Sequence, residues 1–183
     1  MPRRGGPGAN RRQRAAVAVA GPRRPAIKAG IAELYQRAYA PYIERQKSLV
    51  AEVGRTDTST SNIIDSSTYL AEHLAQVPVL VIPCALGRLS GQERSGHVSG
   101  WYGSILPAVW SFQLALRARG LGSAWTTLHL DYEAEAAELL GIPDTVTQVA
   151  LLPVAYTIGT DFKPAVRKPA DEVTYWNIWR SRG

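Results

Sequence analysis

The side chains that most often perform catalysis are few in this sequence and are not spaced for it. The chain has three histidines, His73, His97 and His129, and one cysteine, Cys84, without metal-ligand spacing among them. Nucleophile-elbow, P-loop and GxGxxG patterns are also absent. We therefore expect no metal site and no catalytic side chain, with structural or solvated histidines and a buried Cys84. A bound cofactor would have to supply any chemistry.

The segment Trp125–Leu128 is the strongest candidate for a ligand contact. It follows a helix expected over residues 104–116, which carries apolar side chains on nearly every face. Such a helix must be buried at the centre of a domain or of a dimer. The backbone of Trp125–Leu128 would then emerge deep in the fold, where a flat ligand could be sandwiched. The alternative is that these residues form only a core β-strand, because their types suit one.

The net charge of +6 is concentrated at the start of the chain. Eight basic residues, the last of them Lys28, precede any acid, and from Ala29 onward 13 basic residues face 15 acidic ones. A basic tail can bind phosphates nonspecifically, and binding of nucleic acid through this tail is a weaker alternative. No nucleic-acid motif accompanies it, so we expect no specific nucleic-acid partner. No apolar run approaches the roughly 18–20 residues that span a bilayer, and a single cysteine suits a cytoplasmic protein.

The remaining pattern predicts one α+β domain over residues 26–183, preceded by a poorly ordered basic leader, defined here as residues 1–25. Helices are expected over residues 26–53, from 65 or 66 to about 77, and over 131–140. Strands are expected over residues 79–84, 123–128 and 148–157. Residues 54–62 are expected to form a linker, and residues 90–100 a mobile polar loop. Residues 159–183 are expected to form an extended arm. Its Trp176 and Trp179 must dock either on their own domain or on a second subunit.

Several motifs, in this order, resemble the FMN-dependent nitroreductase family and its actinobacterial-type members in particular. They are YLAEHLAQVPVLVIPC (Tyr69–Cys84), the apolar helix with GLGSAWTTLHL, GIP (Gly141–Pro143) and LLPVAYTIGTDFKPAVRKPADEV (Leu151–Val173). The resemblance covers roughly residues 31–179. It implies a nitroreductase-like α+β fold, with an antiparallel or mixed sheet packed against helices and a long buried central helix. It also implies a homodimer in which the C-terminal arm wraps around the partner.

The resemblance further implies an oxidoreductase that holds FMN noncovalently at the dimer interface. NAD(P)H would be the electron donor, and a nitroaromatic, quinone or similar flat small molecule the acceptor, in a ping-pong sequence of hydride transfers. Carried over by position, Trp125, Thr126, Thr127 and Leu128 would line one side of the isoalloxazine ring. A backbone N–H near Thr127 would face the ring nitrogen that accepts hydride. Arg167 would bind the FMN phosphate through charge-assisted hydrogen bonds.

The N-terminus departs from this family. Members begin with an Arg-Ser-x-Arg helix and continue with an AP-S/T-G-x-N-x-Q-x-W segment, and both contact the flavin. Here the first signature is absent and the second remains only as GPGANRRQR (Gly6–Arg14), while AAVAVAGP (Ala15–Pro22) stands where the family has a strand. One explanation is that residues 1–25 are translated in a shifted reading frame. A truncated, flavin-poor and non-enzymatic dimeric family member is therefore the alternative function.

Overall fold

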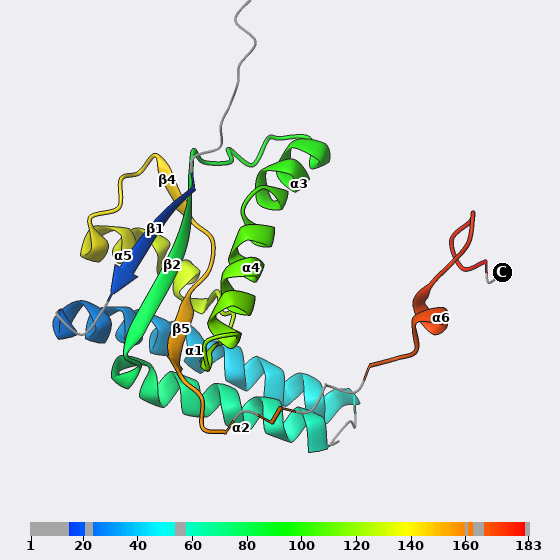
Figure 1. The fold of residues 1–183 in the computed structure, drawn as a ribbon, viewed down its shortest axis with the longest axis horizontal. Coiled ribbons are helices and arrows are strands. Elements are labelled where there is room, and N and C mark those ends of the chain that lie inside the picture. Colours follow the sequence, from blue (N-terminus) through cyan, green and yellow to red (C-terminus); the bar gives the residue numbers. More distant parts are fainter. Residues whose placement is uncertain (1–14, 21–23, 54–57, 160, 163–166, 182–183) are drawn as a thin grey trace, which may run out of the picture.

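The computed structural model describes residues 15–20, 24–53, 58–159, 161–162 and 167–181. It has the predicted α+β class, with one antiparallel sheet between two groups of helices (Figure 1). The strands are β1 (Ala15–Ala20), β2 (Val79–Leu86), β3 (Leu121–Ser123), β4 (Val146–Gln148) and β5 (Leu152–Tyr156). They follow the order β1-β2-β5-β3, and β4 also pairs with β2.

Three of the four predicted helices are confirmed, and the other begins earlier than predicted. The helices are α1 (Pro25–Val53), α2 (Thr58–His73), α3 (Ser95–Gly103), α4 (Leu106–Arg117), α5 (Glu133–Leu140) and α6 (Ala170–Val173), with short 3-10 helices η1 (Leu74–Gln76) and η2 (Leu128–Tyr132). Helix α1 matches the expectation, and α5 ends as predicted at Gly141, whose φ of 67° is the left-handed conformation that glycine tolerates. Helix α2 extends into the predicted linker. The predicted mobile loop at 90–100 is partly wrong, because α3 begins within it.

Strand β2 divides the core into two apolar clusters. Leu80, Ile82 and Cys84 belong to the cluster that contains α1 and α5, whereas Val81 and Ala85 belong to the cluster that contains α4. This alternation follows from the two-residue period of a strand. The predicted burial of Cys84 is confirmed. Because both faces of β2 are covered by side chains, this strand needs an almost continuous apolar sequence.

Helix α4 is less buried than the sequence predicts. Val109 and Leu116 face the core, but Trp110 is 62% exposed and Leu114 is 56% exposed. Burial at the centre of its own domain is therefore wrong for this helix. Its apolar outer face has no cover within the described part of the chain.

The expectation of disorder throughout the leader is wrong for Ala15–Ala20. These residues form β1 and pair antiparallel with β2, from Ala15 opposite Ala85 to Ala20 opposite Leu80. A short alternation of alanine and valine can form an extended strand. Its pairing with β2 supplies hydrogen-bond partners to the backbone groups along the open edge of β2. Residues 1–14 and 21–23 lie outside the described residues, so the reading-frame explanation and the boundary at residue 26 stay predictions.

Two predicted strands also need correction. The strand predicted over 123–128 is only β3, which ends at Ser123, and residues 125–128 leave the sheet. The strand predicted over 148–157 is two strands, β4 and β5, because β2 pairs with β4 near its end and with β5 near its start. The chain between these two pairings bends through residues 149–151, which are buried.

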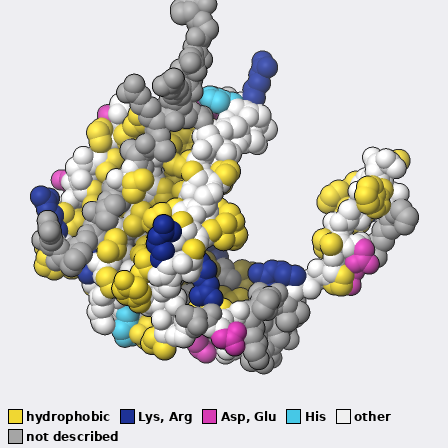
Figure 2. All heavy atoms as spheres, viewed as in Figure 1, with side chains coloured by type: hydrophobic (Ala, Val, Ile, Leu, Met, Phe, Trp, Pro, Cys, Tyr) yellow, Lys and Arg dark blue, Asp and Glu magenta, His cyan; other side chains and the backbone are white. Residues whose placement is uncertain are grey.

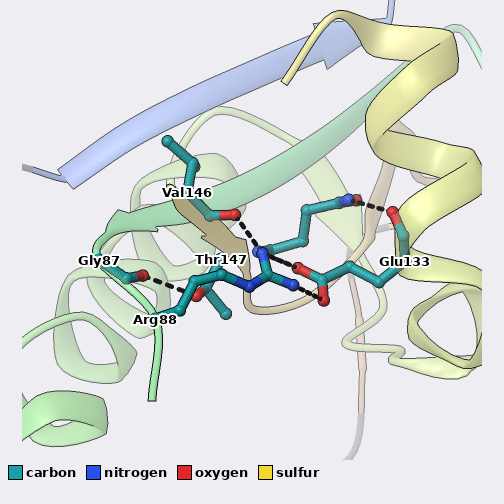
Figure 3. A network of polar contacts seen from close by, with 6 residues as sticks. Gly87, Arg88, Glu133, Val146 and Thr147 are labelled. Atoms are coloured by element: carbon teal, nitrogen blue, oxygen red, sulfur yellow. Dashed lines mark hydrogen bonds and ion pairs between the residues drawn. The ribbon is translucent and has the colours of Figure 1, made fainter. Parts of the chain in front are cut away.

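A polar network ties the end of β2 to α5 and β4 (Figure 3). Both terminal guanidinium nitrogens of Arg88 contact the Glu133 carboxylate, at 2.6 and 3.3 Å. Arg88 also donates to the carbonyl oxygen of Val146 at 2.7 Å. The same carboxylate accepts the backbone N–H of Gln148 at 3.1 Å. This arrangement fixes the start of α5 beside the sheet, and with it the turn that precedes α5.

His129 lies in that turn and is fully buried. Among the described residues, neither of its ring nitrogens has a hydrogen-bond partner, and the side-chain oxygen of Gln148 has none either. Burial lowers the pKa of His129 to about 4, and the nearby Glu133 carboxylate and Gln148 amide only partly oppose this shift. The ring is therefore neutral at physiological pH.

We expect His129 to make folding stability depend on pH between about 6.5 and 4. In this window the unfolded chain binds a proton that the folded chain does not, so stability falls as the pH falls. The total loss should be about 3 kcal/mol or less. Urea unfolding at several pH values measures it. The variant His129→Leu should flatten the dependence, whereas His97→Leu, at an exposed position, should keep it. An unchanged slope in His129→Leu would contradict the assignment.

Candidate functional site

A cavity of about 450 Å³ lies between α1, α2 and the segment 124–128. Its lining combines tyrosines from α1, apolar and hydroxyl side chains from α2, and the predicted ligand-contact segment: Tyr35, Tyr39, Tyr42, Ile63, Ser66, Ser67, Leu70, Ala124, Trp125, Thr126, Thr127 and Leu128. The volume falls in the range of small-molecule sites. Every lining residue is uncharged. The structure thus brings all four predicted residues of the segment to one concave surface.

The backbone of Thr126 attaches this segment to the core. Its N–H donates to the carbonyl oxygen of Leu151 at 3.1 Å, and its carbonyl oxygen accepts the N–H of Leu151 at 2.7 Å. Leu151 is completely buried in the cluster that contains α1. This isolated bridge replaces the regular strand pairing that ends at Ser123. The segment can therefore leave the sheet without losing a fixed position.

The side chain of Thr126 makes a third attachment. Its hydroxyl donates to the phenol oxygen of Tyr35 on α1 at 3.0 Å. Tyr35 is only 2% exposed, and this burial raises the pKa of its phenol, partly opposed by the hydrogen bond from Thr126. The contact joins two elements that are distant in sequence, and it leaves the Thr126 hydroxyl hydrogen committed to the protein.

Thr127 is arranged differently from its neighbour. Its carbonyl oxygen accepts the N–H of Leu130 at 2.9 Å, where η2 begins, but its own N–H has no acceptor within the described ranges. The residue is exposed, whereas Leu128 is partly buried against the core. Trp125 is 39% exposed, so the reading of this segment as a simple core strand is wrong. The result is a fixed main chain in which the Thr127 amide has no protein acceptor within the described ranges.

Three tyrosines form the wall opposite this segment. Tyr35 and Tyr39 are stacked, with ring centroids 6.3 Å apart and an angle of 11° between planes, and the Tyr39 and Tyr42 rings are 6.1 Å apart. Spacings of four and three residues place them on one face of α1. The sequence analysis predicted the helix that carries these residues but did not identify the tyrosines as part of a site. Their spacing was the signal that could have revealed an aromatic wall.

The structure does not bring Arg167 to this cavity. Arg167 is exposed and lies at the start of the arm that carries α6, which extends away from the body of the molecule (Figure 1). The neighbouring residues 163–166 are outside the described residues. Its assignment to a phosphate group stays a prediction.

The uncharged lining restricts what the cavity could do. Among the described residues, no group of His, Cys, Asp or Glu is arranged to hold a metal ion. Within the same described residues, no helix is long and apolar enough to cross a bilayer. Aromatic rings, hydroxyl groups and the Thr127 amide suit a flat, hydrogen-bonding ligand, and none of these groups is a strong acid, base or nucleophile. A bound redox cofactor would fit such a site.

Comparison with known folds agrees with this architecture. The fold is similar to that of oxidized iodotyrosine deiodinase bound to FMN and 3-iodo-L-tyrosine, with a TM-score of 0.61, 18% identity, and coverage of 90% of this chain and 77% of that chain. It is also similar to a nitroreductase-like family protein from Bacillus cereus, with a TM-score of 0.53, 15% identity, and coverage of 92% and 75%. A third similar structure is an FMN and NADPH-dependent nitroreductase from sphigopyxis sp. strain HMH, with a TM-score of 0.52, 16% identity, and coverage of 90% of this chain and 80% of that chain.

These structural likenesses concern the fold, because the identities are low. The sequence comparison with curated proteins found no match. The model of the nitroreductase family, in contrast, matches residues 11–156 of the 183-residue chain. This match confirms the resemblance that the motifs indicate. The chain belongs to the nitroreductase family.

Proposed function

We propose that this protein is an FMN-dependent NAD(P)H oxidoreductase that reduces a nitroaromatic, a quinone or a similar flat acceptor in ping-pong order. The observation that carries the proposal is the fixed main chain of Trp125–Leu128, which lines an uncharged aromatic cavity and leaves the Thr127 amide open. Two of the solved structures with this fold are described as binding or depending on FMN. Family membership and cavity chemistry thus support the same class of cofactor.

The residues present fit the ring of FMN. Trp125, Thr126, Thr127 and Leu128 would line one side of it, and the Thr127 N–H would donate to a ring nitrogen. A fixed amide dipole in a site that excludes water stabilises developing negative charge more than the same dipole in water does. FMN, when bound, supplies the hydride chemistry that the side chains lack. The role of the protein is therefore to orient the ring and to keep water away from it.

Binding of FMN should be visible in the fluorescence of the chain. Purified protein titrated with FMN should lose tryptophan emission, because Trp125 lines the cavity. The variant Trp125→Phe should keep most of the affinity for FMN and show a smaller quenching amplitude. The control Trp101→Phe alters a buried tryptophan outside the cavity lining. It should therefore retain the FMN-induced loss of emission from Trp125. The alternative of a flavin-poor, non-enzymatic family member predicts no saturable quenching. That result would end the proposal.

We further propose that Arg167 binds the FMN phosphate. Replacing a charged hydrogen-bond partner costs about 1.5–3 kcal/mol, so Arg167→Ala should weaken FMN binding about 10- to 150-fold. Riboflavin lacks the phosphate, and its affinity should not respond to the same substitution. Lys168→Ala, at the adjacent exposed position, should have a smaller effect. Equal losses for FMN and riboflavin in Arg167→Ala would contradict a phosphate contact.

The working unit that we propose is a homodimer. The arm carries exposed apolar side chains, including Trp176 at 61% and Trp179 at 77% exposure, and lies apart from its own body (Figure 2). The outer face of α4, with Trp110 and Leu114, is exposed as well. Apolar surface of this kind marks a protein interface more often than a solvated face. Docking on a second copy would cover both surfaces, in preference to docking of the arm on its own domain.

Substitution at Trp110 tests the dimer. Trp110→Glu places a charge on the outer face of α4 without altering the core, so it should shift the sedimentation coefficient from dimer to monomer at micromolar concentration. Leu49→Glu puts the same charge on an exposed leucine of α1 and should leave the dimer intact. A wild-type protein that sediments as a monomer would refute the homodimer directly.

A further inference from the structure

Tyr35 and Tyr39 line the same cavity but use their hydroxyl groups differently. Tyr35 accepts a hydrogen bond from the Thr126 hydroxyl at 3.0 Å. Among the described residues, its phenol oxygen has no second hydrogen-bond partner. A tyrosine hydroxyl carries one hydrogen and can accept as well as donate. The hydrogen of Tyr35 is therefore not donated to any described group of the protein.

The hydrogen of Tyr39, in contrast, is used inside the protein. Its phenol oxygen lies 2.9 Å from Ser67 Oγ and 2.8 Å from Thr68 Oγ1. Both of these hydroxyls donate their own hydrogen to the carbonyl oxygen of Ile64, at 2.9 and 2.8 Å. With those two hydrogens directed to Ile64, the single phenol hydrogen of Tyr39 is donated to this pair of hydroxyl oxygens. The two stacked tyrosines on one helix thus differ in the availability of the hydroxyl hydrogen.

The surroundings of Tyr35 favour an uncharged acceptor for this hydrogen. The side chain is almost completely buried, and a buried donor without an acceptor loses its hydration without replacement. Burial also raises the pKa of Tyr35, so the phenol keeps its hydrogen at neutral pH. The cavity lining holds no charged side chain that would compensate an anionic ligand group. A carbonyl oxygen on a flat conjugated ring meets all of these conditions.

We propose that the Tyr35 hydroxyl donates a hydrogen bond to a carbonyl oxygen of a planar conjugated ligand in the cavity. The inference rests on the proposed function, because that function supplies such a ligand. The carbonyl belongs either to the ring of FMN or to a quinone acceptor. Tyr35 is then a recognition residue of the site and not only a packing residue of α1.

Two variants separate the ligand contact from the internal contact. Tyr35→Phe and Thr126→Val both remove the hydrogen bond between the two side chains, but only Tyr35→Phe removes the free phenol hydrogen. In one arm, each protein is titrated with FMN. In the other arm, with FMN saturating, the KM for menadione is compared with the KM for ferricyanide, which has no carbonyl group. If FMN carries the recognised carbonyl, we expect the Kd for FMN to be about 3- to 10-fold higher in Tyr35→Phe than in Thr126→Val. If the acceptor carries it, we expect the same ratio for the KM of menadione.

The outcomes are distinguishable. A difference in FMN affinity assigns the carbonyl to the flavin ring, and a difference confined to menadione assigns it to the acceptor. Equal values for the two variants in both arms overturn the role of Tyr35 and leave the proposed function standing. A wild-type protein that binds no FMN overturns the proposed function, and the inference falls with it.

A measurement on the unaltered protein covers the case in which Tyr35→Phe does not fold. Difference infrared spectra of wild-type protein, with FMN and then with menadione added, should show a carbonyl stretch moved to lower wavenumber for one of the two ligands. The same band should move in Thr126→Val, which keeps the Tyr35 donor. Carbonyl bands at their solution positions for both ligands in the wild-type protein would overturn the inference.

Discussion

The site depends on one short interaction, the pair of hydrogen bonds between the main chains of Thr126 and Leu151. Leu151 is held between the sheet and α1, in the most buried part of the molecule. Because Thr126 pairs with Leu151, residues 125–128 keep a fixed position and orientation although they have left the sheet. Rigid support of this kind is what a binding surface made of main-chain groups requires, because such groups cannot adjust as side chains can.

Next to this bridge, neighbouring residues have different roles: Thr126 supports the segment, and Thr127 has an amide that the described part of the protein does not use. Thr126 uses its N–H, its carbonyl and its hydroxyl within the protein, and through the last of these it joins α1. The Thr127 amide has no acceptor within the described ranges, and Leu128 returns the chain to the core at the start of η2. Farther along, the contact between Arg88 and Glu133 and the burial of neutral His129 hold the next turn in place. The supporting groups therefore continue for several residues beyond the cavity.

The sequence predicted the elements that local pattern determines, and it missed those that tertiary pairing determines. Helix α1, the end of α5 at Gly141 and the buried strand with Cys84 follow from periodicity, a left-handed glycine and a continuous apolar run. The extent of β3 and the division of residues 146–156 into two strands depend on which part of β2 each strand meets, and no local signal encodes that choice. At the site, residues 125–128 were identified through family motifs. The wall from Tyr35 and Tyr39 was missed because tyrosines at helical spacing also suit an ordinary core.

The bare outer face of α4 and the aromatic arm have a practical consequence for the isolated subunit. Contact of water with the exposed tryptophans of α4 and of the arm is unfavourable, so a single chain would adhere to surfaces, detergents and other apolar partners. Dilution would then remove material by adsorption before any unfolding occurred. Losses on handling would grow as concentration falls, even for a chain whose interior packing is intact.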